Sequence, residues 1–418
     1  MAEHALLSAS AAHRWGNCPG SLAMEAGQEN KSSSYADEGT AAHELAAAFL
    51  TDRWGKTHIT NRTIEIAGGV NYTFDEEMKD YVLAYVNAIR AAAEGGELFV
   101  EQRVDYSNAI GVPGQFGTSD VIIVKGQTLH IRDLKYGRGN EVAAEENEQM
   151  QLYALGALEL VEMLGFDDIQ EIVLAIHQPR LFAVSEWVIT REQLEAFRVD
   201  ISEKAKNAMY WYGKGRNDVE SEFAAGSGDS LNPSESACQW CKAKAICPAL
   251  RNFVLSTVAD DFVDISQDIA PQLASAEERI ANSDNAHVSN CLKAVDLIEN
   301  WCTAVRARAE SELLMGHDVP DFKLVMGRKG NRTWTDEVEA EAKLKSMRLK
   351  KEQMYKFSLE SPTTIGKVLK ETPKRWNKLQ ALITRSDGKP SVAPASDKRD
   401  AYVVEPVADA FDVIEDLA

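Results

Sequence analysis

GQFGTSDVIIVKGQTLHIRDLKYGRG, at residues 114–139, is the stretch that decides the fold. It contains two runs rich in β-branched side chains, at 121–124 and 128–131, separated by the three residues Lys-Gly-Gln. Runs of this kind, joined by a short turn that contains glycine, are typical of a β-hairpin. The stretch therefore predicts two antiparallel strands, around which the rest of the chain is organised.

Acidic side chains stand where the two strands of this hairpin begin and end. Asp120 precedes the first run, and Asp133 and Lys135 follow the second, with Leu134 between them. Because side chains alternate along a strand, Asp133 and Lys135 should share one face, and strand pairing should bring Asp120 close to Asp133. Two carboxylates beside a lysine suit Mg²⁺ or Mn²⁺. An isolated Asp-x-Lys is nevertheless more often a solvated ion pair.

Composition narrows the class of protein. The chain has 418 residues, enough for two or three domains, and 44% hydrophobic residues. Its formal net charge of −20 argues against a protein that coats nucleic acid indiscriminately, but it does not exclude a nuclease with a local basic channel. The chain has no apolar run of membrane-spanning length and no secretion-signal pattern at its N-terminus, which predicts a cytoplasmic location.

The other periodic patterns predict an α/β fold with a central mixed sheet flanked by helices. Further strands are expected at 98–105 and 169–180, and helices at 37–55, 75–93, 143–164 and 191–213. The resulting order of helix, strand, strand, strand, helix and strand is typical of an α/β or α+β domain.

A change in composition near Leu255 predicts the domain organisation. We expect a first domain at 1–255, a mainly helical accessory domain at 256–388 and a polar acidic tail at 389–418. In the accessory domain we expect a long helical stretch at 276–315 and a small β-ribbon around 327–331.

Three of the six cysteines form a compact motif. Cys238, Cys241 and Cys247 follow the pattern C-x2-C-x5-C, and Cys18 is the candidate for a fourth ligand. Such a set can hold a zinc ion or an iron-sulfur cluster. Two close cysteine pairs, which zinc sites usually have, are missing, so the spacing favours iron and sulfur. The remaining two, Cys291 and Cys302, are expected to be buried core thiols.

Four other side chains become candidates for a functional site only when they are taken together with the other motifs. His43 lies in a predicted helix and Glu101 in a predicted strand, and either alone is more often a surface residue. Gln149 and Tyr153 are four residues apart, so they share one face of a helix.

Together these pieces resemble the RecB-like exonuclease branch of the PD-(D/E)xK nuclease superfamily over about the first 255 residues. The resemblance rests on the motifs in their family order: His43, Glu101, Gly117 to Asp120, Asp133 with Lys135, and Gln149 with Tyr153. The cysteines resemble those of AddB-type and CRISPR-associated RecB-like nucleases, in which one N-terminal cysteine and a C-terminal triplet hold a [4Fe-4S] cluster. The C-terminal part resembles phage and prophage RecB-like proteins.

The resemblance implies roles for these residues. Mg²⁺ or Mn²⁺ would be held by His43, Glu101, Asp120, Asp133 and the backbone carbonyl of Leu134. Lys135 would position the attacking water, and Gln149 and Tyr153 would orient the DNA strand or the lysine. The cluster would be held by Cys18, Cys238, Cys241 and Cys247.

The implied activity is metal-dependent DNA exonuclease hydrolysis, in phage or prophage DNA end processing for recombination inside a bacterial cell. Arg132, Arg138 and Arg180 flank the expected site and are candidates for binding DNA, as is the basic span from Lys323 to Lys378. A phage recombinase or a single-strand-binding protein is the expected partner. Two alternatives stay open: a non-catalytic DNA-binding or assembly module, and a structure-specific endonuclease.

Overall fold

A computed structural model of the chain describes residues 5–28, 34–54, 62–66, 69–139, 141–226, 228–258 and 285–323, with the single residues 325, 345, 346 and 377. The chain divides into two compact units, Met1–Val325 and Met326–Ala418. The β-ribbon expected around 327–331, most of the basic span and the acidic tail lie outside the described residues.

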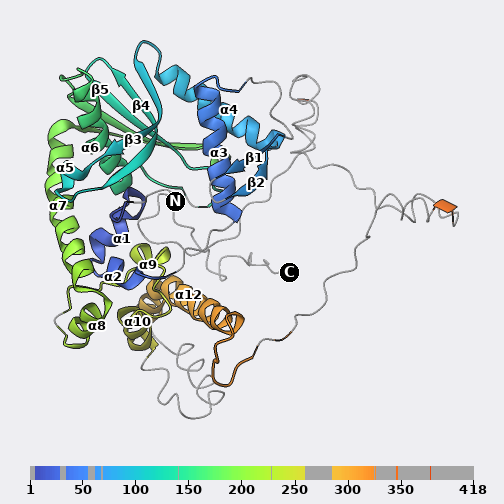
Figure 1. The fold of residues 1–418 in the computed structure, drawn as a ribbon, viewed down its shortest axis with the longest axis vertical. Coiled ribbons are helices and arrows are strands. Elements are labelled where there is room, and N and C mark those ends of the chain that lie inside the picture. Colours follow the sequence, from blue (N-terminus) through green and yellow to red (C-terminus); the bar gives the residue numbers. More distant parts are fainter. Residues whose placement is uncertain are drawn as a thin grey trace, which may run out of the picture. The chain divides into compact units, whose positions relative to one another are not determined.

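A five-stranded mixed sheet forms the centre of this unit (Figure 1), which confirms the predicted α/β class. Its strands lie in the order β3-β4-β5-β6-β7, and only β5 and β6 run parallel. Their bounds are β3 (Glu97–Asp105), β4 (Phe116–Lys125), β5 (Thr128–Leu134), β6 (Glu171–Gln178) and β7 (Ala183–Thr190).

The expected hairpin is formed by β4 and β5. Lys125 pairs with Thr128 across a two-residue turn, and Gly126 in that turn has φ +59°, a backbone conformation that favours glycine. The edge strand β7 was not expected from the sequence, although AVSEWVIT alternates in the manner of a half-exposed strand.

Helices cover both faces of the sheet. On one face, α3 (Ser34–Leu50) and α4 (Glu76–Ala92) pack together and enclose a core with Val121 and Ile123 of β4. On the other face, Ile122 and Ile131 pack with α6 (Glu148–Met163) and α7 (Arg191–Lys214). The alternation of β4 side chains between two cores explains why its apolar run is continuous.

Local signals fix where these helices begin. The side chains of Asp75 and Asn147 each accept a hydrogen bond from a backbone N–H in the first turn of α4 and α6. Thr190 and Gln193 form a capping box at the start of α7. The small hairpin of β1 (Thr63–Ile66) and β2 (Val70–Thr73) lies against α3.

The remaining helices include those that line the cysteines. They are η1 (Ala9–Ala11), α1 (Ala12–Asn17), α2 (Ser21–Glu25), α8 (Arg216–Ala224), α9 (Glu235–Gln239), α10 (Pro248–Val258) and α12 (Asn285–Leu314), and α5 (Ser107–Ile110) and η2 (Pro179–Leu181) complete the unit. In Figure 1, α12 lies against α10. Cys291 and Cys302 on α12 are only half-buried, so the prediction of buried core thiols is wrong. No helix among the described residues is long and apolar enough to cross a membrane.

A candidate metal centre

Strand register brings three carboxylates into one row across the sheet. The cross-strand pairs on either side of Glu101 in β3 place it opposite Asp120 in β4. The β4–β5 register, continued by one residue, places Asp133 on the other side of Asp120. Facing residues on neighbouring strands have Cβ atoms about 4.5–5.5 Å apart. The row therefore gathers acids that are far apart in sequence.

A histidine from a helix completes this group. His43 of α3 places its Nδ1 atom 3.1 Å from Oδ1 of Asp120. The potential ligand atoms of His43, Glu101 and Asp120 all lie within 4.8 Å of one another. Within the described part of the chain, this is the one set of three or more His, Cys, Asp or Glu residues that meets this spacing.

The backbone of Glu101 is adapted to this position. Its φ of +50° lies in the left-handed region, which a residue with a Cβ atom seldom adopts. Such a conformation costs about 1–3 kcal/mol and is found preferentially at functional sites. The twist interrupts the β3–β4 pairing at Glu101 alone, since the pairs before and after it are intact.

Asp120 is oriented by the hairpin itself. Its Oδ2 atom accepts a hydrogen bond of 2.7 Å from the backbone N–H of Leu134, the last residue of β5. This bond fixes one carboxylate oxygen, so the other faces His43. The same contact satisfies a backbone donor at the end of the strand.

A second group of polar side chains surrounds Asp133. The Nζ atom of Lys135 lies 3.0 Å from Oδ2 of Asp133 and donates to Oε1 of Gln149 at 3.3 Å. Gln149 in turn donates to Oδ1 of Asp133 at 3.4 Å and to the Tyr153 hydroxyl at 3.3 Å. The Tyr153 ring fits because residue 117 is glycine: a Cβ atom there would lie 2.6 Å from Cε1 of the tyrosine.

The electrostatics show that the site attracts positive charge. Burial, followed by the charge of Asp120, raises the pKa of Glu101 to about 7. Burial disfavours the protonated form of His43, but the neighbouring carboxylates, Asp120 first, outweigh it and raise the pKa to about 9. Burial also raises the pKa of Asp133, against the opposing charge of Lys135. A proton or a metal ion would relieve this crowding of negative charge.

The three arginines expected to bind DNA are each paired with an acid. Arg132 is buried, and its Nη2 atom lies 3.2 Å from Oε2 of Glu186. It lies on the face of β5 opposite Asp133 and Lys135, because side chains alternate along the strand. Arg180 and Arg138 pair with Glu38 of α3 and Glu77 of α4, respectively. Of the three, Arg138 has the most exposed side chain, at 59%.

Two residues near the site were missed by sequence reasoning. Glu38 binds Arg180 at 2.8 Å, and the Arg180 guanidinium lies 4.8 Å from the centre of the Tyr136 ring. Tyr136 directly follows Lys135, and Glu38 precedes His43 by five residues on the same helix. Both residues could therefore have been identified, because each lies near a predicted site residue in the sequence.

The four predicted cysteine ligands line one small cavity, which α1, α2, α9 and α10 surround. The backbone N–H of Asn232 donates to Sγ of Cys18 at 3.4 Å, which ties the N-terminal cysteine to the segment before the triplet. Burial is the largest influence on all four thiols and raises their pKa, that of Cys18 to about 12. Thiolates at this site would need a bound cation.

One comparison with known proteins bears on the chain. The model of a family described as protein of unknown function (DUF2800) matches residues 4–400. The match covers both the candidate metal centre and the cysteines.

Proposed function

We propose that this chain, which belongs to the DUF2800 family of proteins of unknown function, is a metal-dependent deoxyribonuclease that hydrolyses DNA phosphodiester bonds. The observation that carries the proposal is the row of Glu101, Asp120 and Asp133 on three adjacent strands, with His43 against Asp120 and Lys135 against Asp133. This arrangement fits a PD-(D/E)xK nuclease core.

The donor set fits a hard divalent cation. Carboxylate oxygens from Glu101, Asp120 and Asp133, with the carbonyl of Leu134, suit Mg²⁺, and the imidazole of His43 makes Mn²⁺ equally acceptable. The raised pKa of Glu101 supports this fit, because its carboxylate remains hard to ionise beside Asp120 even with His43 nearby. When bound, the ion supplies a water of lowered pKa and screens the charge on the phosphate.

The remaining side chains orient the reactants. Lys135 donates hydrogen bonds beside Asp133, so its ammonium group can hold a water and stabilise charge that develops on the phosphate. Its pKa is raised because Asp133 outweighs the effect of burial, and the lysine therefore stays protonated at neutral pH. Gln149 holds both Lys135 and Asp133 in place and is itself held by Tyr153.

We further propose that the four cysteines hold an iron-sulfur cluster. Cys18, Cys238, Cys241 and Cys247 line one cavity, although Cys18 is far from the other three in sequence. The C-x2-C-x5-C spacing with a remote fourth cysteine supports an iron-sulfur cluster, with zinc as the less favoured occupant.

The test of the nuclease proposal is an assay on matched linear and closed circular DNA with Mn²⁺ or Mg²⁺. We expect progressive loss of the linear DNA, survival of the circles and a loss of at least about 100-fold in rate for Asp133→Ala. Arg198→Ala, a surface variant that removes an exposed pair with Glu195, is the control and should keep full activity. Digestion of circles would favour an endonuclease. An inert wild type that still binds DNA would favour a non-catalytic module.

A further inference from the structure

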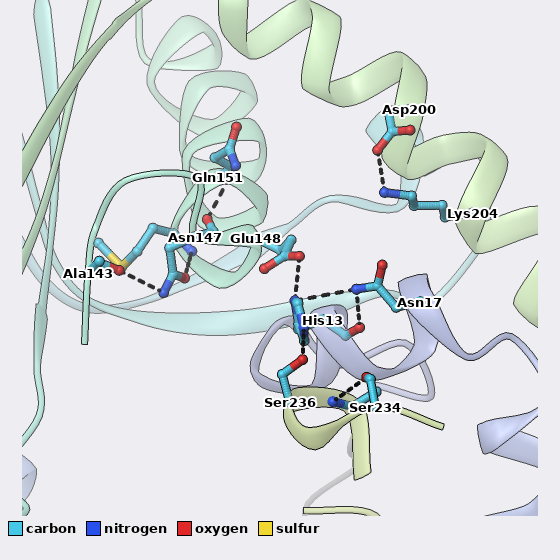
Figure 2. Close-up of polar contacts among 12 residues, drawn as sticks. His13, Asn17, Ala143, Asn147, Glu148, Gln151, Asp200, Lys204, Ser234 and Ser236 are labelled. Atoms are coloured by element: carbon cyan, nitrogen blue, oxygen red, sulfur yellow. Dashed lines mark hydrogen bonds and ion pairs between the residues drawn. The ribbon is translucent and has the colours of Figure 1, made fainter. Parts of the chain in front are cut away.

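His13 connects three segments that are far apart in sequence (Figure 2). Its Nδ1 atom lies 2.8 Å from Oε1 of Glu148 at the start of α6, and its Nε2 atom lies 2.8 Å from Oγ of Ser236 in α9. The histidine itself belongs to α1, where the Asn17 side chain donates to its backbone carbonyl at 2.7 Å. One ring therefore joins α1, α6 and α9.

Each of these segments carries a residue of a proposed centre. Ser236 precedes Cys238 by two residues, and α1 ends at Asn17, directly before Cys18. Glu148 directly precedes Gln149, whose amide holds Asp133 and Lys135. The histidine thus forms a polar link between α9, which carries Cys238, and the start of α6, which carries Gln149.

The contact with Glu148 indicates which ring nitrogen carries the proton. A carboxylate accepts hydrogen bonds only, so Nδ1–H of His13 donates to Glu148. In the neutral ring, Nε2 then accepts from the Ser236 hydroxyl. The two ring nitrogens bind different helices. A shift of α9 therefore either breaks the hydrogen bond to Ser236 or moves the ring away from Glu148 of α6.

The segment on the cysteine side depends on its surroundings. The helix α9 has five residues, Glu235–Gln239, and helices of this length are not stable alone. Cys238 lies in this helix and Cys241 follows its last residue by two positions, so a cluster bound to both would fix its position. The helix α6 has sixteen residues. Its buried residues begin at Met150, whereas Glu148 and Gln149 at its start are partly exposed.

We propose that His13 is a positioning residue that makes the placement of Gln149, and through it Lys135, depend on occupation of the four-cysteine centre. The inference rests on the proposed function in that the cysteines bind a metal cluster. A ligand-free cysteine centre would loosen α9, release Ser236 from His13 and allow the first turn of α6 to open.

The experiment compares hydrogen exchange at residues 148–153 in protein purified anaerobically with its iron and in the same protein after the iron is removed. In His13→Phe the ring is kept while both hydrogen bonds are lost. The matched control is Lys204→Ala. It removes the ion pair on α7 in which Nζ of Lys204 lies 2.7 Å from Oδ2 of Asp200 (Figure 2). This pair contacts neither Glu148 nor Ser236.

In the wild type and the control, iron removal should speed exchange at 148–153 by about three- to tenfold, the effect of one or two hydrogen bonds. His13→Phe with a full iron content should exchange fast already and should not respond to iron removal. Its kcat on DNA should fall with KM unchanged. His13→Gln, whose amide offers one donor and one acceptor, should restore part of the protection.

Three results would overturn the inference. The first is that iron-loaded His13→Phe exchanges at 148–153 as slowly as the wild type. The second is that Lys204→Ala speeds this exchange as much as His13→Phe does. The third is that the exchange rate at 148–153 in the wild type does not change when the iron is removed. A protein that binds no iron or other metal at its cysteines would instead refute the cluster itself, which separates this failure from the others. Exchange is measured without DNA, so a failure of the nuclease proposal is also distinguishable.

Discussion

At the scale of single residues, Glu101 shows how the site opposes local stability. A glutamate at φ +50° carries backbone strain. Partial desolvation of its carboxylate, followed by the charge of Asp120, raises its pKa to about 7, although the residue as a whole is exposed. Neither feature stabilises the strand. Both are expected of a residue whose position serves ligand binding rather than folding.

His177 supplies a prediction about pH at the same scale. Burial, followed by the Arg132 cation, lowers the pKa of this imidazole from 6.5 to about 4. Between these two pH values the unfolded chain binds a proton here that the folded chain does not, so stability rises with pH through this window. The contribution is complete above pH 6.5 and is lost as the pH falls to about 4. Its size is up to about 3 kcal/mol.

His177→Phe tests this prediction, since a phenyl ring keeps the edge contact with Tyr85, whose ring centre lies 5.2 Å away. Urea unfolding at pH 7 and pH 5 should show a smaller loss of stability on acidification in the variant than in the wild type. The variant will be less stable at both pH values because Arg132 loses a partner. Equal losses in the two proteins would contradict the assignment to His177.

At the scale of elements, the contact between β4 and α6 is set by Gly117. Alanine at this position would place its Cβ atom 2.6 Å from Cε1 of Tyr153, so either the ring or the helix must move. We expect Gly117→Ala to lower the free energy of unfolding by about 1–3 kcal/mol. Nuclease activity should fall as well, because Tyr153 holds Gln149.

Gly139→Ala is the matched control for this variant. It lies in the same stretch of sequence, has an ordinary φ and has no atom within 4 Å of an added Cβ. Urea denaturation and the DNA assay should leave it close to wild type. If Gly117→Ala matched the control in both measurements, the close approach of β4 and α6 would be refuted.

Some of these elements follow from the sequence alone, and others do not. The hairpin of β4 and β5 and the common face of Gln149 and Tyr153 depend on spacing within one element, so they could be predicted. The approach of His43 to Asp120 depends on how α3 packs against the sheet, which no local pattern specifies. Arg132 could have been placed from the sequence. Side-chain alternation along the strand puts it on the face opposite Lys135, which the expectation of a DNA contact did not take into account.

At the scale of the whole first unit, hydrogen bonds connect the N-terminal helices to the segment at 230–242. The backbone N–H of Gly20 donates to the Ser230 carbonyl at 2.7 Å, and that of Lys242 to the Glu25 carboxylate at 2.7 Å. A cluster shared by Cys18 and the triplet would close a loop of more than two hundred residues, which lowers the entropy of the open state.

Cys18→Ser should therefore lose most of the iron and open the N-terminal helices to proteolysis. The control is Cys302→Ser, a half-buried cysteine on α12 outside the cavity, which should keep its iron and its resistance. Iron content and limited trypsin digestion measure the two effects. Unchanged iron in Cys18→Ser would exclude this residue as the fourth ligand.

The central claim is that the carboxylates on β3, β4 and β5 hold a divalent ion. The most direct measurement is the anomalous diffraction of manganese in crystals grown with Mn²⁺. We predict a peak within about 2.0–2.6 Å of a carboxylate oxygen of Asp120, with Glu101, Asp133 or His43 as further ligands. Manganese bound elsewhere, or none at this position at saturating concentration, would contradict the account.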